Sequence, residues 1–199
     1  MVSASTLATY DDLLRLPEGT RGEVLAGTVV VPPAPLPRHS NPQGGLRRFV
    51  GGPYHDDDGF GGPGGWWIFV EVDVRFSSHD IVRPDLSGWL RPRLPEPDVR
   101  PIDVVPDWVC ESLSPSTASR DRVDKRRLYA KHGVRYYWLV DPDARTLEAL
   151  ELRDGRWVDA GTFDEEDAHA RVPPFDGVEL PVPRLFLPRT VVPEEGDGG

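Results

Sequence analysis

The fold is decided by residues 108–132, which read WVCESLSPSTASRDRVDKRRLYAKH. Residues 108–113 are apolar except for Glu111 and Ser112, and this pattern predicts a buried strand. The hydroxyl-rich turn at 114–117 is typical of a segment that caps a following helix. That helix is predicted over residues 120–132, where a glycine then provides a stop signal. The stretch therefore predicts a strand and a capped helix, with the carboxylate of Glu111 carried on the strand.

Further strands are predicted on both sides of this stretch, and their clearest signals are alternation and turn residues. Residues 66–76 alternate strictly between two faces, so they are predicted to form one strand. Asp154-Gly155 between two apolar runs is a strong hairpin signal. The predicted strands are residues 23–25, 28–31, 66–76, 81–90, 108–113, 134–140, 146–152 and 156–160.

Helices and loops separate these strands. A first helix is predicted over residues 10–16, where Pro17 ends it. Residues 32–42 are rich in Pro, and residues 51–65, rich in Gly and Pro, are predicted to be a mobile loop. The order of elements predicts an α/β (α+β) protein in which helices flank a mixed β-sheet and a β-hairpin extension follows.

Length and composition limit the organisation of the chain. Its 199 residues fit a single domain over 1–190, with a core at about 10–152, a β extension at about 145–190 and an acidic flexible tail at 191–199. The single cysteine, Cys110, excludes an internal disulfide and fits a reducing compartment. The N-terminal residues lack the features of an export signal, and no apolar run reaches membrane-spanning length, so we expect a cytoplasmic protein without a membrane partner.

Two carboxylates stand in apolar surroundings. Asp85 follows a proline in a predicted strand, and Glu111 shares a strand face with Val109 and Leu113. Two buried carboxylates about 4 Å apart would repel by roughly 4 kcal/mol at an effective dielectric constant of about 20. A divalent cation would remove that cost, because Mg²⁺ takes carboxylate oxygens and water as ligands. The alternative is that each acid pairs with an arginine or faces solvent.

The predicted helix over 120–132 is basic in an otherwise acidic protein. The net charge is −10, which argues against a surface that binds nucleic acid everywhere, but a local basic face remains open. The helix charges indicate either a phosphate-binding face or an ordinary solvated one. Helical spacing places Asp121, Lys125, Leu128 and Tyr129 on one stripe, which we expect to face the sheet. The simpler alternative is that Lys125 only pairs with Asp121, one turn earlier.

A series of short motifs stands in order between Tyr10 and about Leu152. The motifs are Thr9-Tyr10-Asp11-Asp12, Gly22-Glu23-Val24-Leu25, Pro37-Arg38-His39-Ser40, Arg83-Pro84-Asp85-Leu86, Glu111-Ser112-Leu113-Ser114-Pro115-Ser116-Thr117, Asp121-Arg122-Val123-Asp124-Lys125, Tyr129-Ala130-Lys131-His132-Gly133-Val134 and Tyr137-Trp138-Leu139-Val140-Asp141-Pro142. Together they resemble the bacterial Uma-two family of endonucleases, which belongs to the restriction-endonuclease-like PD-(D/E)xK superfamily.

The resemblance implies a restriction-endonuclease-like fold and metal-dependent hydrolysis of phosphodiester bonds in DNA. It implies Asp85 and Glu111 as catalytic acids that bind Mg²⁺ or Mn²⁺, and Glu23 as an accessory acid at the rim. The superfamily's lysine normally stands two residues after the second acid, where this chain has Leu113. The family resembled takes its lysine from the following helix, which here is Lys125.

Contacts with the nucleic acid are expected from Arg122, Arg126 and Arg127 of the basic helix and from His39. The glycines from Gly51 onward are expected to interrupt an amphipathic helix of the family. Nucleases of this fold commonly form homodimers, so the resemblance leaves open both a monomer and a homodimer. Two other functions also stay open: a catalytically silent nucleic-acid-binding module on the nuclease fold, and a non-nucleolytic interaction protein whose carboxylates are ordinary ion-pair partners.

Overall fold

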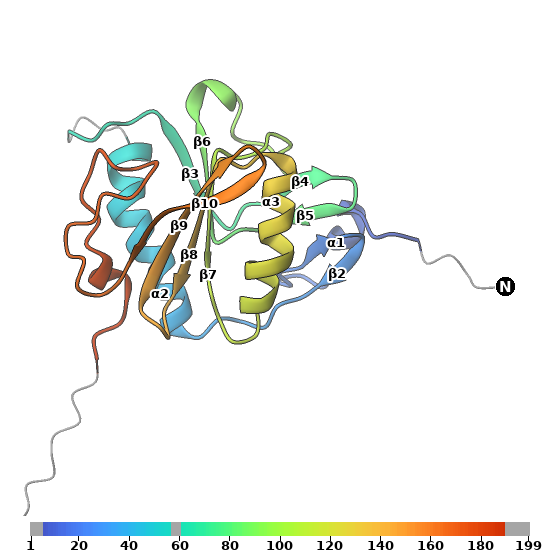
Figure 1. The fold of residues 1–199 in the computed structure, drawn as a ribbon. Coiled ribbons are helices and arrows are strands. Elements are labelled where there is room, and N and C mark those ends of the chain that lie inside the picture. Colours follow the sequence, from blue (N-terminus) through green and yellow to red (C-terminus); the bar gives the residue numbers. More distant parts are fainter. Residues whose placement is uncertain (1–5, 57–60, 190–199) are drawn as a thin grey trace, which may run out of the picture.

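A six-stranded mixed sheet forms the centre of the protein (Figure 1). The structure is a computed structural model that describes residues 6–56 and 61–189; the predicted acidic tail at 191–199 lies outside the described residues. The strand order is β10-β9-β8-β7-β6-β3, in which only the β7–β8 pair is parallel. The strands are β3 (Trp66–Val70), β6 (Leu86–Leu90), β7 (Trp108–Ser112), β8 (Tyr136–Asp141), β9 (Thr146–Arg153) and β10 (Arg156–Phe163).

The parallel β7–β8 pair requires a crossover connection, and the predicted basic helix provides it. This helix consists of η3 (Arg120–Lys125), a wide π-type segment, and α3 (Arg126–His132). It ends at Gly133, whose φ of 78° lies in the left-handed region that glycine adopts without strain. The crossover places the helix against the sheet beside the strand that carries Glu111.

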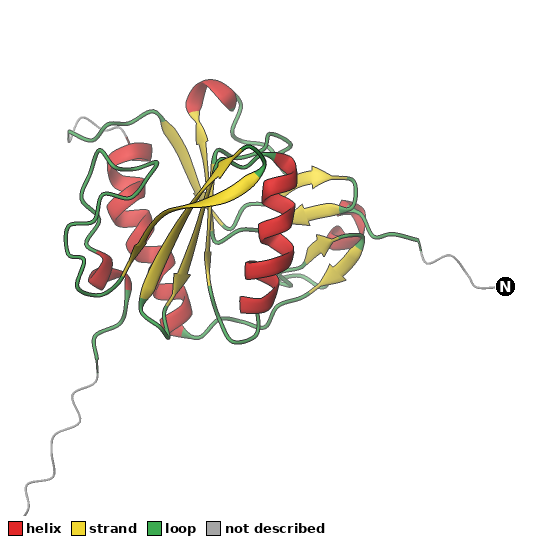
Figure 2. Cartoon of the chain, viewed as in Figure 1, coloured by secondary structure: helices red, strands yellow, loops and turns green. Residues whose placement is uncertain are grey.

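A second, four-stranded sheet lies beside α3 (Figure 2). Its order is β2-β1-β5-β4, and the short helix α1 (Tyr10–Leu14) contacts β1. Two tight turns confirm the predicted hairpins, at Ala26-Gly27 in this sheet and at Asp154-Gly155 in the large one, with positive φ at all four residues. The strands are β1 (Glu23–Leu25), β2 (Thr28–Val30), β4 (Val74–Ser77) and β5 (Asp80–Val82).

Two strands predicted as continuous are each divided between the two sheets, so those predictions are wrong. Residues 66–76 break at Glu71, whose φ of 51° turns the chain out of β3 and towards β4. Residues 81–90 break at Arg83-Pro84-Asp85. Pro84 has no N–H to donate to a sheet, so the ladder ends there and begins again in β6.

The prediction of a loop at 51–65 is also wrong for its first residues. Helix α2 (Pro37–Leu46) begins with a proline at its first turn, where a missing N–H costs nothing, and continues as the π-type segment η1 (Arg47–Asp56). Leu46, Val50 and Tyr54 are buried against the sheet. That packing outweighs the low helix propensity of the glycines, so the expected interruption at Gly51 does not occur.

Helices cover both faces of the large sheet, as predicted. Figure 1 shows α2 on one side and α3 on the other. The α2 face packs the larger core, in which the rings of Trp108 and Trp138 meet edge to face at 5.2 Å between centroids. The α3 face packs a smaller core around Tyr129 and Tyr137. Two 3₁₀ turns, η2 (Arg91–Arg93) and η4 (Val182–Leu185), complete the elements. Among the described residues, none of the helices has the length and apolar character needed to cross a bilayer.

Candidate active site

Asp85 and Glu111 lie side by side in the large sheet: Asp85 immediately precedes β6, and Glu111 lies on the neighbouring strand β7. β6 pairs antiparallel with β7, and its first residue, Leu86, is opposite Cys110. Continuing this register by one residue places Asp85 opposite Glu111. The predicted adjacency of the two strands is therefore confirmed. The N–H of Ser112 donates to Asp85 Oδ2 at 2.5 Å, which holds the Asp85 carboxylate against the end of β7.

Lys125 lies among three buried carboxylates. Its Nζ is 2.9 Å from Glu23 Oε1, 3.0 Å from Glu111 Oε1 and 3.7 Å from Asp121 Oδ1. Only 4% of the surface of Lys125 is exposed. The predicted pair with Asp121 is present, but it is the longest of the three contacts. Lys125 is thus directed into the sheet region and towards the carboxylates, as the stripe of the helix indicated.

The π-type winding of η3 helps to place these groups. Asp121, Lys125 and Tyr129 follow one another at four-residue intervals, and all three side chains are buried. The N–H of Arg126 donates to the carbonyl of Asp121, five residues back, which marks the wider turn. π-type turns occur frequently at functional sites, because they redirect side chains that a regular helix would place differently.

Two donors meet at one oxygen of Glu111. The Tyr129 hydroxyl donates to Glu111 Oε1 at 2.6 Å, and Lys125 contacts the same atom. In the described part of the chain, no donor contacts Glu111 Oε2 or Asp85 Oδ1 by a hydrogen bond. Both residues line the cleft, so each keeps one carboxylate oxygen for a ligand there.

The electrostatic balance of the site is one ammonium among four carboxylates. Burial raises the pKa of Asp85 to about 7, and burial also raises the pKa values of Glu111 and Asp121. Burial alone would lower the pKa of Lys125, but Glu111, Glu23 and Asp121 outweigh that effect and raise it. The ammonium therefore stays charged, and the site is short of positive charge.

These groups form the floor of a cleft of about 870 Å³. Glu23, on β1 of the small sheet, enters from one side, where its Oε1 also accepts the N–H of Arg83 at 2.8 Å. The cleft is also lined by the apolar segment 31–36, by the hydroxyl-rich turn 114–117 and by Arg120. The cleft thus takes its carboxylates from both sheets and its lysine from the helix between them.

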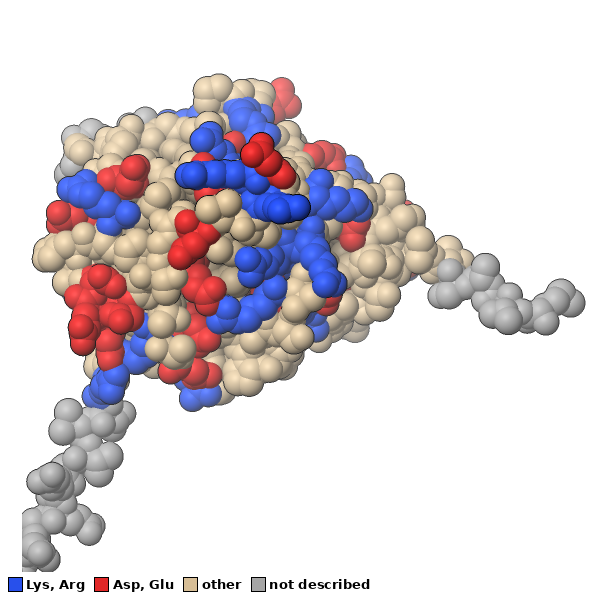
Figure 3. All heavy atoms as spheres, in the orientation of Figure 1, with Lys and Arg blue, Asp and Glu red and all other residues tan. Residues whose placement is uncertain are grey.

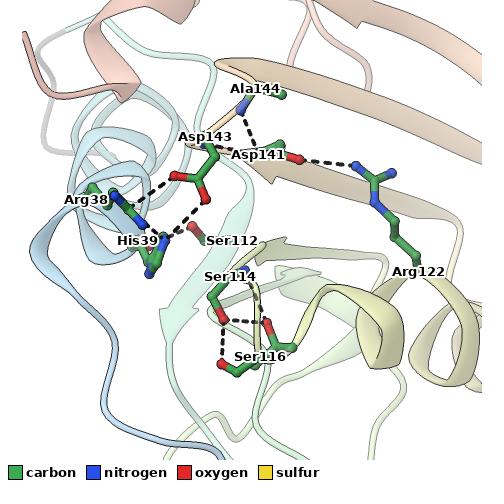
Figure 4. Close-up of polar contacts among 10 residues, drawn as sticks. Arg38, His39, Ser112, Ser114, Ser116, Arg122, Asp141, Asp143 and Ala144 are labelled. Carbon is green, nitrogen blue, oxygen red and sulfur yellow. Dashed lines mark hydrogen bonds and ion pairs between the residues drawn. The ribbon is translucent and has the colours of Figure 1, made fainter. Parts of the chain in front are cut away.

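His39 is a buried residue that lines this cleft from the first turn of α2 (Figure 4). Its carbonyl accepts the Ser112 hydroxyl at 2.6 Å, and its ring Nε2 accepts a hydrogen bond from Arg38 at 3.1 Å. The Asp143 carboxylate pairs with Arg38 at 3.1 Å and lies 3.9 Å from the His39 ring. These contacts join α2 to the ends of β7 and β8 beside the site.

The three predicted arginines do not line the cleft. Arg122 points towards Asp141 at the end of β8, with which it pairs at 3.4 Å (Figure 4). It also pairs with Glu148 of β9 at 2.7 Å. Arg126 is half-buried and Arg127 is exposed on α3. Figure 3 shows basic side chains gathered over this helix on one face of the molecule. The basic residue of the helix that does line the cleft, besides Lys125, is Arg120.

Sequence reasoning did not single out Asp121, Tyr129 and Arg120 as functional residues. Asp121 and Tyr129 flank Lys125 at intervals of four residues, so their spacing was the signal that could have identified them. Arg120 stands at the start of the helix, next to the hydroxyl-rich turn, and nothing in the spacing distinguishes it from its basic neighbours.

A divalent cation fits the donor set of this site. Asp85 and Glu111 offer carboxylate oxygens, the ligand type that Mg²⁺ prefers. Lys125 is a single ammonium shared among three carboxyl groups, and its contact with Oε1 of Glu111 leaves Oε2 without a hydrogen-bond donor among the described residues. Within the described residues, no group of three or more His, Cys, Asp and Glu side chains is arranged to hold a metal. Two protein carboxylates, completed by water and substrate phosphate, are nevertheless a common way of binding Mg²⁺.

Comparison with known proteins agrees with this architecture. A solved structure from Anabaena variabilis, described as “a putative nuclease”, is 29% identical, with a TM-score of 0.68 over 89% of this chain and 97% of that chain. No curated protein gives a significant match. The model of the Uma2 (Uma-two) family, described as “Putative restriction endonuclease”, matches residues 8–183. Both descriptions support a nuclease, and the fold is the expected mixed sheet flanked by helices. Because the family match spans most of the chain, this protein belongs to the Uma2 family.

Proposed function

We propose that this protein is a metal-dependent endonuclease that hydrolyses phosphodiester bonds in DNA, with Mg²⁺ or Mn²⁺ as its cofactor. One observation carries the proposal. Asp85, Glu111 and Lys125, which come from two neighbouring strands and the helix that follows them, meet at the floor of one cleft. Membership of the Uma2 family supports the same reaction class.

Asp85 and Glu111 would hold the cation through the oxygens that the protein leaves without donors. When bound, a divalent cation polarises a phosphoryl group and lowers the pKa of a coordinated water. Glu23 contributes charge to the site through Lys125 rather than through a direct ligand contact. Glu23 would act as an accessory acid, because its contact with Lys125 holds the ammonium beside Glu111.

Lys125 would orient the attacking water or stabilise charge that develops on the phosphoryl oxygens. Its Nζ lies within 3.0 Å of oxygens of Glu23 and Glu111, and the Asp121 oxygen is farther away, at 3.7 Å. The 3.7 Å contact to Asp121 is the weakest, so it is the one that a substrate oxygen replaces most easily. The ammonium can thus reach the substrate without losing the two contacts that hold it in place.

The DNA backbone would lie across the rim of the cleft. Arg120 and His39 line the cleft itself, and Arg126 and Arg127 extend the basic surface along the helix. Arg122 is engaged by two carboxylates, so its part in the predicted contact is the weakest of the three arginines. A cytoplasmic location completes the proposal, because the buried free thiol of Cys110 fits a reducing compartment. We also propose that residues 1–190 form a single domain and that the protein assembles as a homodimer.

A catalytically silent nucleic-acid-binding module is the second candidate. The observation that favours it is the ion-pair network itself, because Lys125 already compensates Glu23 and Glu111 in the absence of a metal. Such a module would bind DNA with the same surface, but it would not turn over.

A cleavage assay separates the two candidates. The wild type is incubated with supercoiled, linear and single-stranded DNA, with Mg²⁺, with Mn²⁺ or with EDTA. We expect nicking or cutting that requires metal and that Glu111→Gln abolishes. Glu148→Gln is the matched control, because it removes a carboxylate from β9 that contacts Arg122 outside the cleft. DNA binding without metal-dependent cleavage of any substrate would establish the silent module instead.

A further inference from the structure

Tyr129 is a buried residue of α3 that contacts the proposed site through one atom. None of its surface is exposed, and its hydroxyl donates to Glu111 Oε1 at 2.6 Å. The ring packs against Phe76 of the small sheet and Tyr137 of the large one, with centroids 5.6 Å and 5.1 Å away. The hydroxyl is therefore fixed by a ring that has little freedom to move.

The contact decides which oxygen of Glu111 faces the cleft. A glutamate side chain has several rotatable bonds, and its two oxygens are chemically equivalent until neighbours distinguish them. Tyr129 and Lys125 both engage Oε1, so Oε2 remains for a ligand. Lys125 alone is shared among three carboxylates, whereas the Tyr129 hydroxyl donates to Glu111 only.

Tyr137 provides a comparison within the same core. It is equally buried, and its hydroxyl also donates one hydrogen bond, at 3.0 Å. The acceptor is the backbone carbonyl of Asp121, so this bond supports the π-type turn and touches no carboxylate. The two tyrosines lie in contact and differ in what their hydroxyls hold.

We propose that Tyr129 is a positioning residue whose hydroxyl fixes the rotamer of Glu111 and presents Oε2 to the cation. The inference rests on the proposed function for its cation. Groups that hydrogen-bond to metal ligands typically change metal affinity or activity about 10-fold to 100-fold when they are removed. Tyr129 acts in this way through Glu111 and touches neither the cation nor the substrate.

The test compares Tyr129→Phe with Tyr137→Phe. Each variant keeps the ring and removes one buried hydroxyl, so their structural costs are matched. Isothermal titration of the DNA-free protein with Mn²⁺ measures affinity without reference to activity. We expect Tyr129→Phe to bind Mn²⁺ about 10-fold or more weakly than the wild type, and Tyr137→Phe to bind it nearly as the wild type does. Urea unfolding confirms that both variants fold.

Two outcomes would overturn the inference: unchanged Mn²⁺ affinity in Tyr129→Phe, or an equal loss in both variants. A metal-free crystal structure of Tyr129→Phe gives a second readout, in which we expect the Glu111 carboxylate to turn or to occupy more than one conformation. A wild type that binds no Mn²⁺ would refute the proposed function instead. In that case the crystal structure decides alone, and an unmoved Glu111 would overturn the positioning role.

Discussion

Lys125 Nζ lies 2.9 Å from Glu23 Oε1, and this contact joins the helix on the large sheet to the first strand of the small sheet. Both side chains are buried, with 4% of each residue exposed. Because Lys125 also contacts Glu111 on β7, one ammonium connects its own helix to a strand of each sheet. The relationship makes Lys125 part of the fold as well as part of the proposed chemistry.

Lys125→Met should lower the free energy of unfolding by about 3–5 kcal/mol, because it leaves buried carboxylates without their cation. Urea unfolding at neutral pH measures the change. Adding Glu23→Gln should restore part of the loss, since it removes one of the uncompensated charges. An additive double-variant cycle, in which Glu23→Gln destabilises both backgrounds equally, would show that the two residues are not coupled.

Asp85→Asn should abolish metal-dependent cleavage and yet stabilise the metal-free protein. Burial raises the pKa of Asp85 to about 7, so the ionised carboxylate is held in unfavourable surroundings. Removing its charge should raise the free energy of unfolding by about 1 kcal/mol in EDTA at pH 8, less than the full pKa shift implies because part of the residue is open to the cleft. Urea unfolding and the plasmid assay check the two effects separately. A variant that loses activity and stability together would place Asp85 among the structural residues.

The sequence predicted the parts of this site that depend on local pattern. Alternation placed Glu111 on an apolar strand face, and helical spacing placed Lys125 on the stripe with Tyr129; both side chains are buried as expected. The motif series also predicted the family. These features follow from neighbours within a few residues, which is why one sequence sufficed.

Other features depend on contacts that local pattern does not contain. Glu71 adopts a φ of 51°, and its N–H donates to the carbonyl of Asp85 at 3.2 Å, a partner fourteen positions away. Helix η1 runs through two glycines because Val50 and Tyr54 are buried against strands that come later in the chain. In both places tertiary packing overrides the local preference of the residues, so the boundaries of these elements were wrong.

Arg120→Ala should weaken DNA binding. It should also reduce the slope of the logarithm of the binding constant against the logarithm of the salt concentration by about one. The reason is that Arg120 lines the cleft, where a phosphate would lie. Arg122→Ala is the matched variant two residues away, and it should leave affinity and slope unchanged, because Arg122 is paired with Glu148 and Asp141. Fluorescence anisotropy over a salt series measures both. Equal effects of the two substitutions would mean that the whole helix, including its outer face, contacts DNA.

Asp73→Asn should flatten the loss of stability in acid. Burial alone would raise the pKa of Asp73, but hydrogen bonds from Arg83 and Arg100 outweigh it and lower the pKa below its ordinary 3.8. The unfolded chain therefore takes up this proton first, so the stabilisation is complete above about pH 4 and is lost as pH falls through the lower, folded-state value. Urea unfolding between pH 6 and pH 2 should show a steeper decline for the wild type than for the variant. Parallel curves would remove Asp73 from the acid response.

The chain passes from one sheet to the other and back, and this order limits how the sheets can assemble during synthesis. β3 joins the large sheet, β4 and β5 join the small one, and β6 returns to the large sheet. During synthesis, therefore, neither sheet can be finished before the other has begun, and pairings such as Val24 with Ile81 must wait for distant residues to emerge from the ribosome. Lys125, which completes the ion-pair network, emerges after all the acids that it contacts. A nascent or truncated chain that ends before Lys125 thus carries these carboxylates without the ammonium that stabilises them, and three strands of the large sheet, β8, β9 and β10, are still to be made when Lys125 is added.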